Sequence, residues 1–85
     1  MAERFEYYLY QEKVFAYDTE STFLVYFREG DWHEECNVPH DTLLDESVSR
    51  RLSEEEAMAI VGGVNPLEAT EAIILQDMYK NIFCP

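Results

Sequence analysis

Basic residues are scarce in this chain, and no other feature of the sequence is as informative. Six lysines and arginines stand against eighteen aspartates and glutamates in 85 residues, which gives a formal net charge of −12. A protein with this charge is repelled by nucleic acid and by anionic lipid. The composition therefore argues against direct binding to either and favours a basic protein as the partner.

Cysteines and long apolar runs are also scarce. Cys36 and Cys84 are too few for a disulfide framework, and we expect two reduced thiols in a cytoplasmic protein. A bridge between them is the alternative. No apolar run approaches about 18 residues, so we expect no membrane-spanning segment. The first six residues lack the apolar core of a secretory signal.

Signatures of catalysis are missing as well. Gly62 and Gly63 lack the lysine and serine of a phosphate-binding loop, and neither a nucleophile elbow nor a cysteine–histidine signature occurs. A chain of this size has little room for a closed pocket of several hundred Å³. We expect a non-enzymatic protein that uses no cofactor.

The chain nevertheless has the composition of a folded protein. Hydrophobic residues make up 47% of it and aromatic residues 14%, whereas disorder driven by charge goes with few of either. Its length predicts one small domain over residues 1–85. A net charge of about 2–8 in magnitude is enough for solubility, so the excess acidity needs an explanation.

The first third of the chain reads as β-structure. Apolar residues alternate over residues 4–10 and 22–28, and residues 14–17 form another β-rich run. The short polar links between them predict a three-stranded antiparallel meander. Alternation places Phe5, Tyr7 and Leu9 on one face of the sheet, with Phe23, Val25 and Phe27. It places Tyr8, Tyr10 and Tyr26 on the other face, with Leu24.

The remainder of the chain reads mainly as helical. Leu44, Val48 and Leu52 recur at four-residue spacing, which predicts a helix over residues 42–52 capped by Asp41. A fourth strand over residues 47–52 is the alternative. Residues 32–40 give no clear element.

Two further helices have sharper signals. Ser53 and Glu56 form a capping-box pattern for a helix over residues 54–61, ended by Gly62 and Gly63. Asn65 is predicted to cap a last helix that begins at Pro66. The expected apolar face of that helix includes Leu67, Ile74, Leu75, Met78 and Ile82. The predicted fold is α+β: the meander followed by two or three helices packed on one sheet face.

The aromatic strands and the acidic residues together suggest a contact surface. Tyrosine is enriched at protein interfaces, and the outward tyrosines would form an apolar centre with an acidic rim. The alternative is a sheet buried on both sides. The candidate partner-binding residues are Glu6, Tyr8, Tyr10, Glu12, Asp18, Glu20, Tyr26, Glu29, Asp31, Glu34, Glu35, Glu54 and Glu55. Glu3, Glu68 and Glu71 are further acidic candidates.

The charge has a mechanistic interpretation. Carboxylates fixed on a folded surface can occupy the positive groove of a nucleic-acid-binding protein and displace its nucleic acid. In size and charge, and in no motif, the chain resembles small phage-encoded anti-restriction and anti-CRISPR inhibitors. We therefore expect an acidic inhibitor that docks on a basic, nucleic-acid-binding surface of a partner protein. The alternatives are a structural or adaptor module, homodimeric through its aromatic sheet, and an immunity protein against a basic toxin nuclease.

One cluster has residue types that bind metals. His33, Cys36 and His40 are all possible zinc ligands, but the paired spacing of a zinc site is missing. We expect no metal and keep these three residues as a weak candidate.

Overall fold

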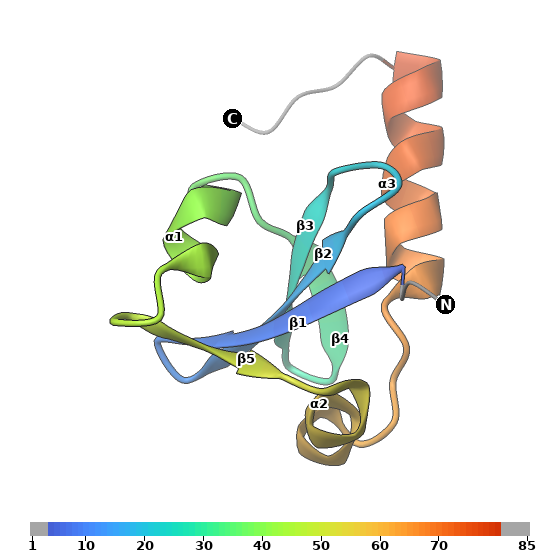
Figure 1. The fold of residues 1–85 in the computed structure, drawn as a ribbon. Coiled ribbons are helices and arrows are strands. Elements are labelled where there is room, and N and C mark those ends of the chain that lie inside the picture. The colour runs from blue at the N-terminus through green and yellow to red at the C-terminus, as the bar shows by residue number, and fades with distance from the viewer. Residues whose placement is uncertain (1–3, 81–85) are drawn as a thin grey trace.

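The computed structural model describes residues 4–80, with side chains described for residues 4–76. Strands come first in this part of the chain, and a fifth strand lies between the first two of three helices (Figure 1). The elements are β1 (Phe5–Tyr10), β2 (Lys13–Asp18), β3 (Leu24–Arg28), β4 (Asp31–Glu34), α1 (His40–Leu44), β5 (Ser49–Leu52), α2 (Glu54–Val61) and α3 (Leu67–Lys80).

The strands form one antiparallel sheet in the order β4-β3-β2-β1-β5. The α+β class is confirmed, but the prediction of three strands is wrong. Strand β4 extends the meander, and β5 returns to pair with the outer side of β1. The sequence indicated β4 poorly because it has only four residues, of which Asp31 and Glu34 are charged and exposed.

Two tight turns set the register of the meander. Gln11 and Glu12 have φ values of 49° and 65°, and Glu29 and Gly30 have φ values of 54° and 83°. Two successive residues with positive φ match the right-handed twist of the strands that they join. These turns pair Tyr10 with Lys13 and Arg28 with Asp31.

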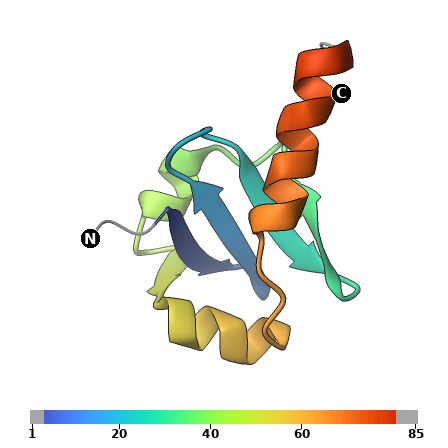
Figure 2. The ribbon, with the colours of Figure 1, turned by 90° about the vertical axis from the view of Figure 1, so that its right-hand side faces the viewer.

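Both faces of the sheet are covered. Helices α2 and α3 lie toward the viewer in Figure 2, and α1 lies behind the sheet. The first core lies under α2 and α3 and contains Phe5, Tyr7, Val14, Ala16, Val25, Trp32, Leu52, Ala57 and Val61. The second core lies under α1 and contains Tyr8, Phe15, Leu24 and Leu43. The alternation predicted for β1 and for β3 from Leu24 onward is confirmed, whereas Phe23 precedes the strand. The predicted packing of all helices on one face is wrong, because Leu43 of α1 lies in the second core.

The predicted helix over residues 42–52 is also wrong. Helix α1 ends at Leu44, and the Asp45 carboxylate accepts hydrogen bonds from the Ser47 N–H and hydroxyl, at 2.9 and 2.7 Å. The alternative strand is present as β5, which buries Leu52 in the first core. The four-residue spacing did not mark an apolar face, because Leu44 and Val48 are 53% and 50% exposed. Residue Asp41 does not cap α1, whose N-cap is Pro39.

Helix α2 and the start of α3 follow the sequence signals closely. The capping box of Ser53 and Glu56 is formed, and Gly62 ends α2 with φ 76°. The Asn65 carboxamide oxygen accepts the Leu67 N–H at 2.8 Å, as expected of a residue that caps the helix. Helix α3 begins at Leu67, one residue later than predicted.

The predicted apolar face of α3 is only partly buried, and its members Leu67 and Ile74 are both half-buried. Leu67, Ala69 and Ile73 pack against the first core, whereas Leu75 is 52% exposed. The Met78 side chain and Ile82 lie outside the description. In the part of the chain that is described, no helix is long and apolar enough to cross a membrane.

Candidate protein-binding surface

The predicted acidic residues are divided between the two ends of the sheet. The β1–β2 and β3–β4 turns lie at one end, which brings together Glu12, Glu29 and Asp31. The β2–β3 turn, the end of β4 and the start of α2 lie at the opposite end. That end carries Glu20, Glu34, Glu35, Glu54 and Glu55. The acidic residues therefore form at least two separate surfaces and not one continuous patch.

Tyr8 is not available as a surface contact. It is only 3% exposed, because Leu43 of α1 packs over it. Its hydroxyl donates to Glu6 Oε1 at 2.9 Å, and the Arg51 guanidinium lies 5.3 Å from its ring centroid. Burial, together with the hydrogen bond to Glu6, raises the pKa of the Tyr8 hydroxyl.

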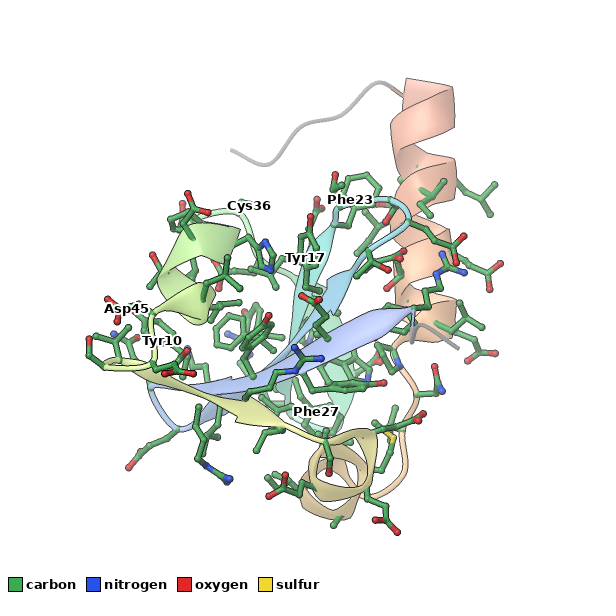
Figure 3. All side chains as sticks on the ribbon, in the orientation of Figure 1. Tyr10, Tyr17, Phe23, Phe27, Cys36 and Asp45 are labelled. Atoms are coloured by element: carbon green, nitrogen blue, oxygen red, sulfur yellow. The ribbon has the colours of Figure 1, made fainter. Side chains whose placement is uncertain are left out.

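The other tyrosines on this face are half-buried. Tyr10, Tyr17 and Tyr26 all pack against the second core, and Figure 3 shows Tyr17 on the α1 side of the sheet and Phe27 on the α2 side. These tyrosines lie on the predicted face of the sheet. That face is largely covered, so the alternative of a sheet buried on both sides fits better than an exposed tyrosine surface. A homodimer through this face would find little open apolar area.

Asp18 is buried and belongs to the structure of the β2–β3 turn. It has no exposed surface, and the Arg4 guanidinium donates to both of its carboxylate oxygens, at 3.0 and 2.9 Å. Burial alone would raise the pKa of Asp18, but hydrogen bonds from Arg4, Ser21 and the Glu20 N–H outweigh it and lower that pKa to about 2. Asp18 therefore contributes no accessible charge to a partner.

Glu6 and Glu35 are likewise used within the chain. Glu6 accepts the Tyr8 hydroxyl and lies 3.4 Å from His40 Nε2. Glu35 accepts the Asn37 N–H at 2.8 Å. Both side chains are half-buried, which limits the part they can take in a docking surface.

The weak metal candidate is not assembled. The His33 ring lies against Tyr26 with its Nε2 3.1 Å from the Arg28 carbonyl oxygen, whereas the His40 ring stacks on Tyr17. Within residues 4–76, no three His, Cys, Asp or Glu side chains gather as metal ligands would.

The expectation of two reduced thiols is wrong for one of them. Cys36 is disulfide-bonded, so it is not available as a thiolate ligand. Cys84 lies outside the described residues.

The first turn of α2 holds two predicted carboxylates at an open cavity. This cavity has a volume of about 500 Å³ and is lined by Ser53, Glu54, Glu55 and Met58. Glu54 also lines a smaller cavity of about 160 Å³, together with Arg4, Phe5, Tyr7 and Asn65. We call these residues the α2 groove. It runs from the first turn of α2 toward the start of β1.

The capping box explains why Glu54 and Glu55 face outward. Glu56 Oε1 accepts the Ser53 N–H at 3.0 Å, and Glu56 Oε2 accepts from Arg50 at 3.2 Å. Those hydrogen bonds lower the pKa of Glu56 and commit its charge to the fold. In the described structure, neither the Glu54 nor the Glu55 side chain has an ion pair or hydrogen bond. Their carboxylates remain available to a cation.

Met58 is the groove residue that sequence reasoning missed. It lies four residues after Glu54 on α2 and is half-buried against the first core. An apolar residue one helical turn beyond a carboxylate gives the groove a polar and an apolar end. That pairing suits a lysine or arginine, whose aliphatic stem packs on apolar surface while its charge remains at the rim.

No protein-family model, no curated protein and no solved structure matches the chain.

Proposed function

We propose that this chain is a non-enzymatic acidic protein that docks on a basic surface of a partner protein, with the α2 groove at the centre of the contact. The observation that carries the proposal is the position of Glu54 and Glu55 beside Met58 on an open cavity. Two carboxylates without internal partners, next to an apolar floor, match the chemistry of a lysine or arginine side chain.

The way the chain uses its own cations supports this proposal. Arg4 is bound to Asp18, with Glu20 at 3.6 Å, and Arg50 is bound to Glu56. Arg4 lines one end of the α2 groove, but its guanidinium is held by Asp18, so neither arginine is paired with Glu54 or Glu55. A net charge of −12 adds a long-range field that accelerates encounter with a cationic partner.

The most concrete form of the proposal is inhibition of a nucleic-acid-binding protein. Such a protein presents lysines and arginines along a groove, and its affinity for nucleic acid comes largely from neutralised phosphates. The first turn of a capped helix fixes the backbone of Glu54 and Glu55 before binding, so only their side-chain rotamers have to be ordered on contact. The chain would occupy the groove and exclude the nucleic acid.

The first experiment maps the surface with a defined cationic probe. A blocked peptide of one leucine and four lysines is titrated into isotopically labelled protein, and amide shifts are followed by NMR. We expect shifts at residues 53–58 and neighbouring parts of β1, and about threefold or greater weakening in the variant Glu54→Gln/Glu55→Gln. The matched control is Glu12→Gln/Glu29→Gln, which removes the same charge at the other end of the sheet. Equal weakening in both variants would show a diffuse charge effect and reject the α2 groove.

A further inference from the structure

The α2 groove consists of two cavities that share one carboxylate. The larger cavity, of about 500 Å³, is lined by Ser53, Glu54, Glu55 and Met58. The smaller cavity, of about 160 Å³, lies between the start of β1 and the start of α2, and Glu54 lines it as well. Successive side chains on one face of an extended segment are about 7 Å apart, which is close to the reach of a single long side chain. Two such side chains of one segment can therefore enter the two cavities together.

The smaller cavity has a preformed apolar lining. Phe5 and Tyr7 provide it, and these residues are only 7% and 2% exposed because they belong to the first core. Side chains of a packed core keep fixed positions, so this apolar surface exists before anything binds to it. A cavity of this size and lining has room for one branched aliphatic side chain of a partner, which gains by leaving water.

Arg4 also lines the smaller cavity but does not make it cationic. Its guanidinium donates to both oxygens of the Asp18 carboxylate, at 3.0 and 2.9 Å, and lies 3.6 Å from the Glu20 carboxylate. The same guanidinium lies 5.5 Å from the centroid of the Phe5 ring. Its charge is therefore balanced within the chain, and the unbalanced charge at the groove is that of Glu54 and Glu55.

Asn65 places an unused hydrogen-bond donor at the rim of the smaller cavity. Its carboxamide oxygen accepts the Leu67 N–H at 2.8 Å, whereas its carboxamide nitrogen has no hydrogen-bond partner among the residues that the structure describes. The residue is exposed. This nitrogen can donate to a backbone carbonyl group of a segment that crosses the rim. Such a contact to the main chain fixes which side chains of the segment face the cavities.

We propose that the α2 groove recognises an extended segment of the partner protein in which an aliphatic residue lies two positions from a lysine or arginine. This inference rests on the proposed function and adds a sequence preference to it. The aliphatic side chain enters the smaller cavity, and the basic side chain packs along Met58 and pairs with Glu54 and Glu55. Side chains two positions apart in an extended segment point the same way, whereas those three positions apart point to opposite sides.

The test compares two blocked pentapeptides of equal composition and charge, titrated into labelled protein at low salt. In lysine-alanine-leucine-alanine-lysine, each lysine lies two positions from the leucine, whichever way the segment runs. In leucine-alanine-alanine-lysine-lysine, neither lysine does. We expect the first peptide to bind about threefold or more tighter than the second. It should shift the side-chain amide signals of Asn65 and the backbone amide of Phe5, together with the amides of residues 53–58.

A neutral variant tests the main-chain contact. Asn65→Ser keeps a residue that can cap α3 but removes the carboxamide nitrogen, so it should weaken binding of the first peptide by about threefold. The matched control is Asn37→Ser, an exposed position in the connection between β4 and α1, which should leave the affinity unchanged. Equal affinity of the two variants would show that Asn65 does not hold the segment and would contradict the proposal.

The peptide comparison separates failure of this inference from failure of the proposed function. Equal affinity of the two peptides, with shifts at residues 53–58, would reject the sequence preference and leave the proposed function standing. No shift at residues 53–58 with either peptide at millimolar concentration would reject both. Shifts there that depend on the concentration of the protein alone would assign the groove to a second copy of the chain, which also overturns the proposal.

Discussion

The Arg4 guanidinium binds both oxygens of the Asp18 carboxylate, at 3.0 and 2.9 Å, and so ties the start of β1 to the end of β2. The same carboxylate accepts the Glu20 N–H and the Ser21 hydroxyl, at 2.9 and 2.7 Å. One buried acid thus organises the whole β2–β3 turn. In a chain where acids are abundant on the surface, this one is structural.

The variant Asp18→Asn should destabilise the fold at neutral pH by about 2 kcal/mol, because charge-assisted hydrogen bonds are lost and Arg4 keeps an unbalanced charge. Urea unfolding followed by Trp32 fluorescence at pH 7 measures this difference. The matched control is Glu12→Gln, an exposed turn residue that should change the unfolding free energy by less than about 0.5 kcal/mol. Equal effects of the two variants would contradict the structural role of Asp18.

The Asp18 pKa also predicts a dependence of stability on pH. Its folded pKa of about 2 lies below the usual aspartate pKa of 3.8, so the charged form contributes stability above about pH 4. That contribution, up to about 2 kcal/mol, is lost as the pH falls toward 2. Urea unfolding between pH 5 and pH 2 should therefore show a steeper loss for the natural chain than for Asp18→Asn. Parallel curves would show that Asp18 is not the group responsible.

Leu43 is expected to be the residue that keeps α1 on the sheet. It is 1% exposed and packs with Tyr8 and Phe15, so Leu43→Ala should cost about 3 kcal/mol. Its neighbour Leu44 is 53% exposed, and Leu44→Ala should cost less than about 0.5 kcal/mol. Chemical denaturation of the Leu43→Ala and Leu44→Ala variants tests whether Leu43 packs in the second core. A small effect of Leu43→Ala would mean that α1 does not cover Tyr8.

The capping box at α2 gives a smaller predicted effect. Ser53→Ala removes the acceptor of the Glu56 N–H, at 3.1 Å, and should cost about 1 kcal/mol. Amide hydrogen exchange should rise at residues 54–57 and remain unchanged in β2. The control Ser47→Ala, in the loop before β5, should leave exchange in α2 unchanged.

The parts of the fold that sequence predicted best have local causes. The α2 helix is specified by its capping box and by the left-handed Gly62, and both signals lie within ten residues. The two faces of β1 and β3 follow from strict alternation. The burial of Asp18 was not predictable, because it depends on Arg4, fourteen residues earlier in the chain.

The helix predicted over residues 42–52 was wrong for a related reason. Its four-residue spacing satisfied a helical pattern, but pairing of β5 with β1 and burial of Leu52 outweighed that local preference. Tertiary pairing routinely overrides propensity in so short a segment. That Lys13, Arg28 and Arg51 share one face of the sheet was not predictable for the same reason, because the register of the strands brings them there.

The most direct test of the account uses a basic protein captured by this chain and compares its affinity at low and high salt for three forms of the chain. The forms are the natural chain, Glu54→Gln/Glu55→Gln and Glu12→Gln/Glu29→Gln. We predict that added salt weakens binding of the natural chain steeply, and that the Glu54/Glu55 variant loses about tenfold in affinity at low salt while the control loses much less. Affinity that stays constant across salt concentrations, or that is the same for all three forms, would contradict docking through fixed carboxylates on α2.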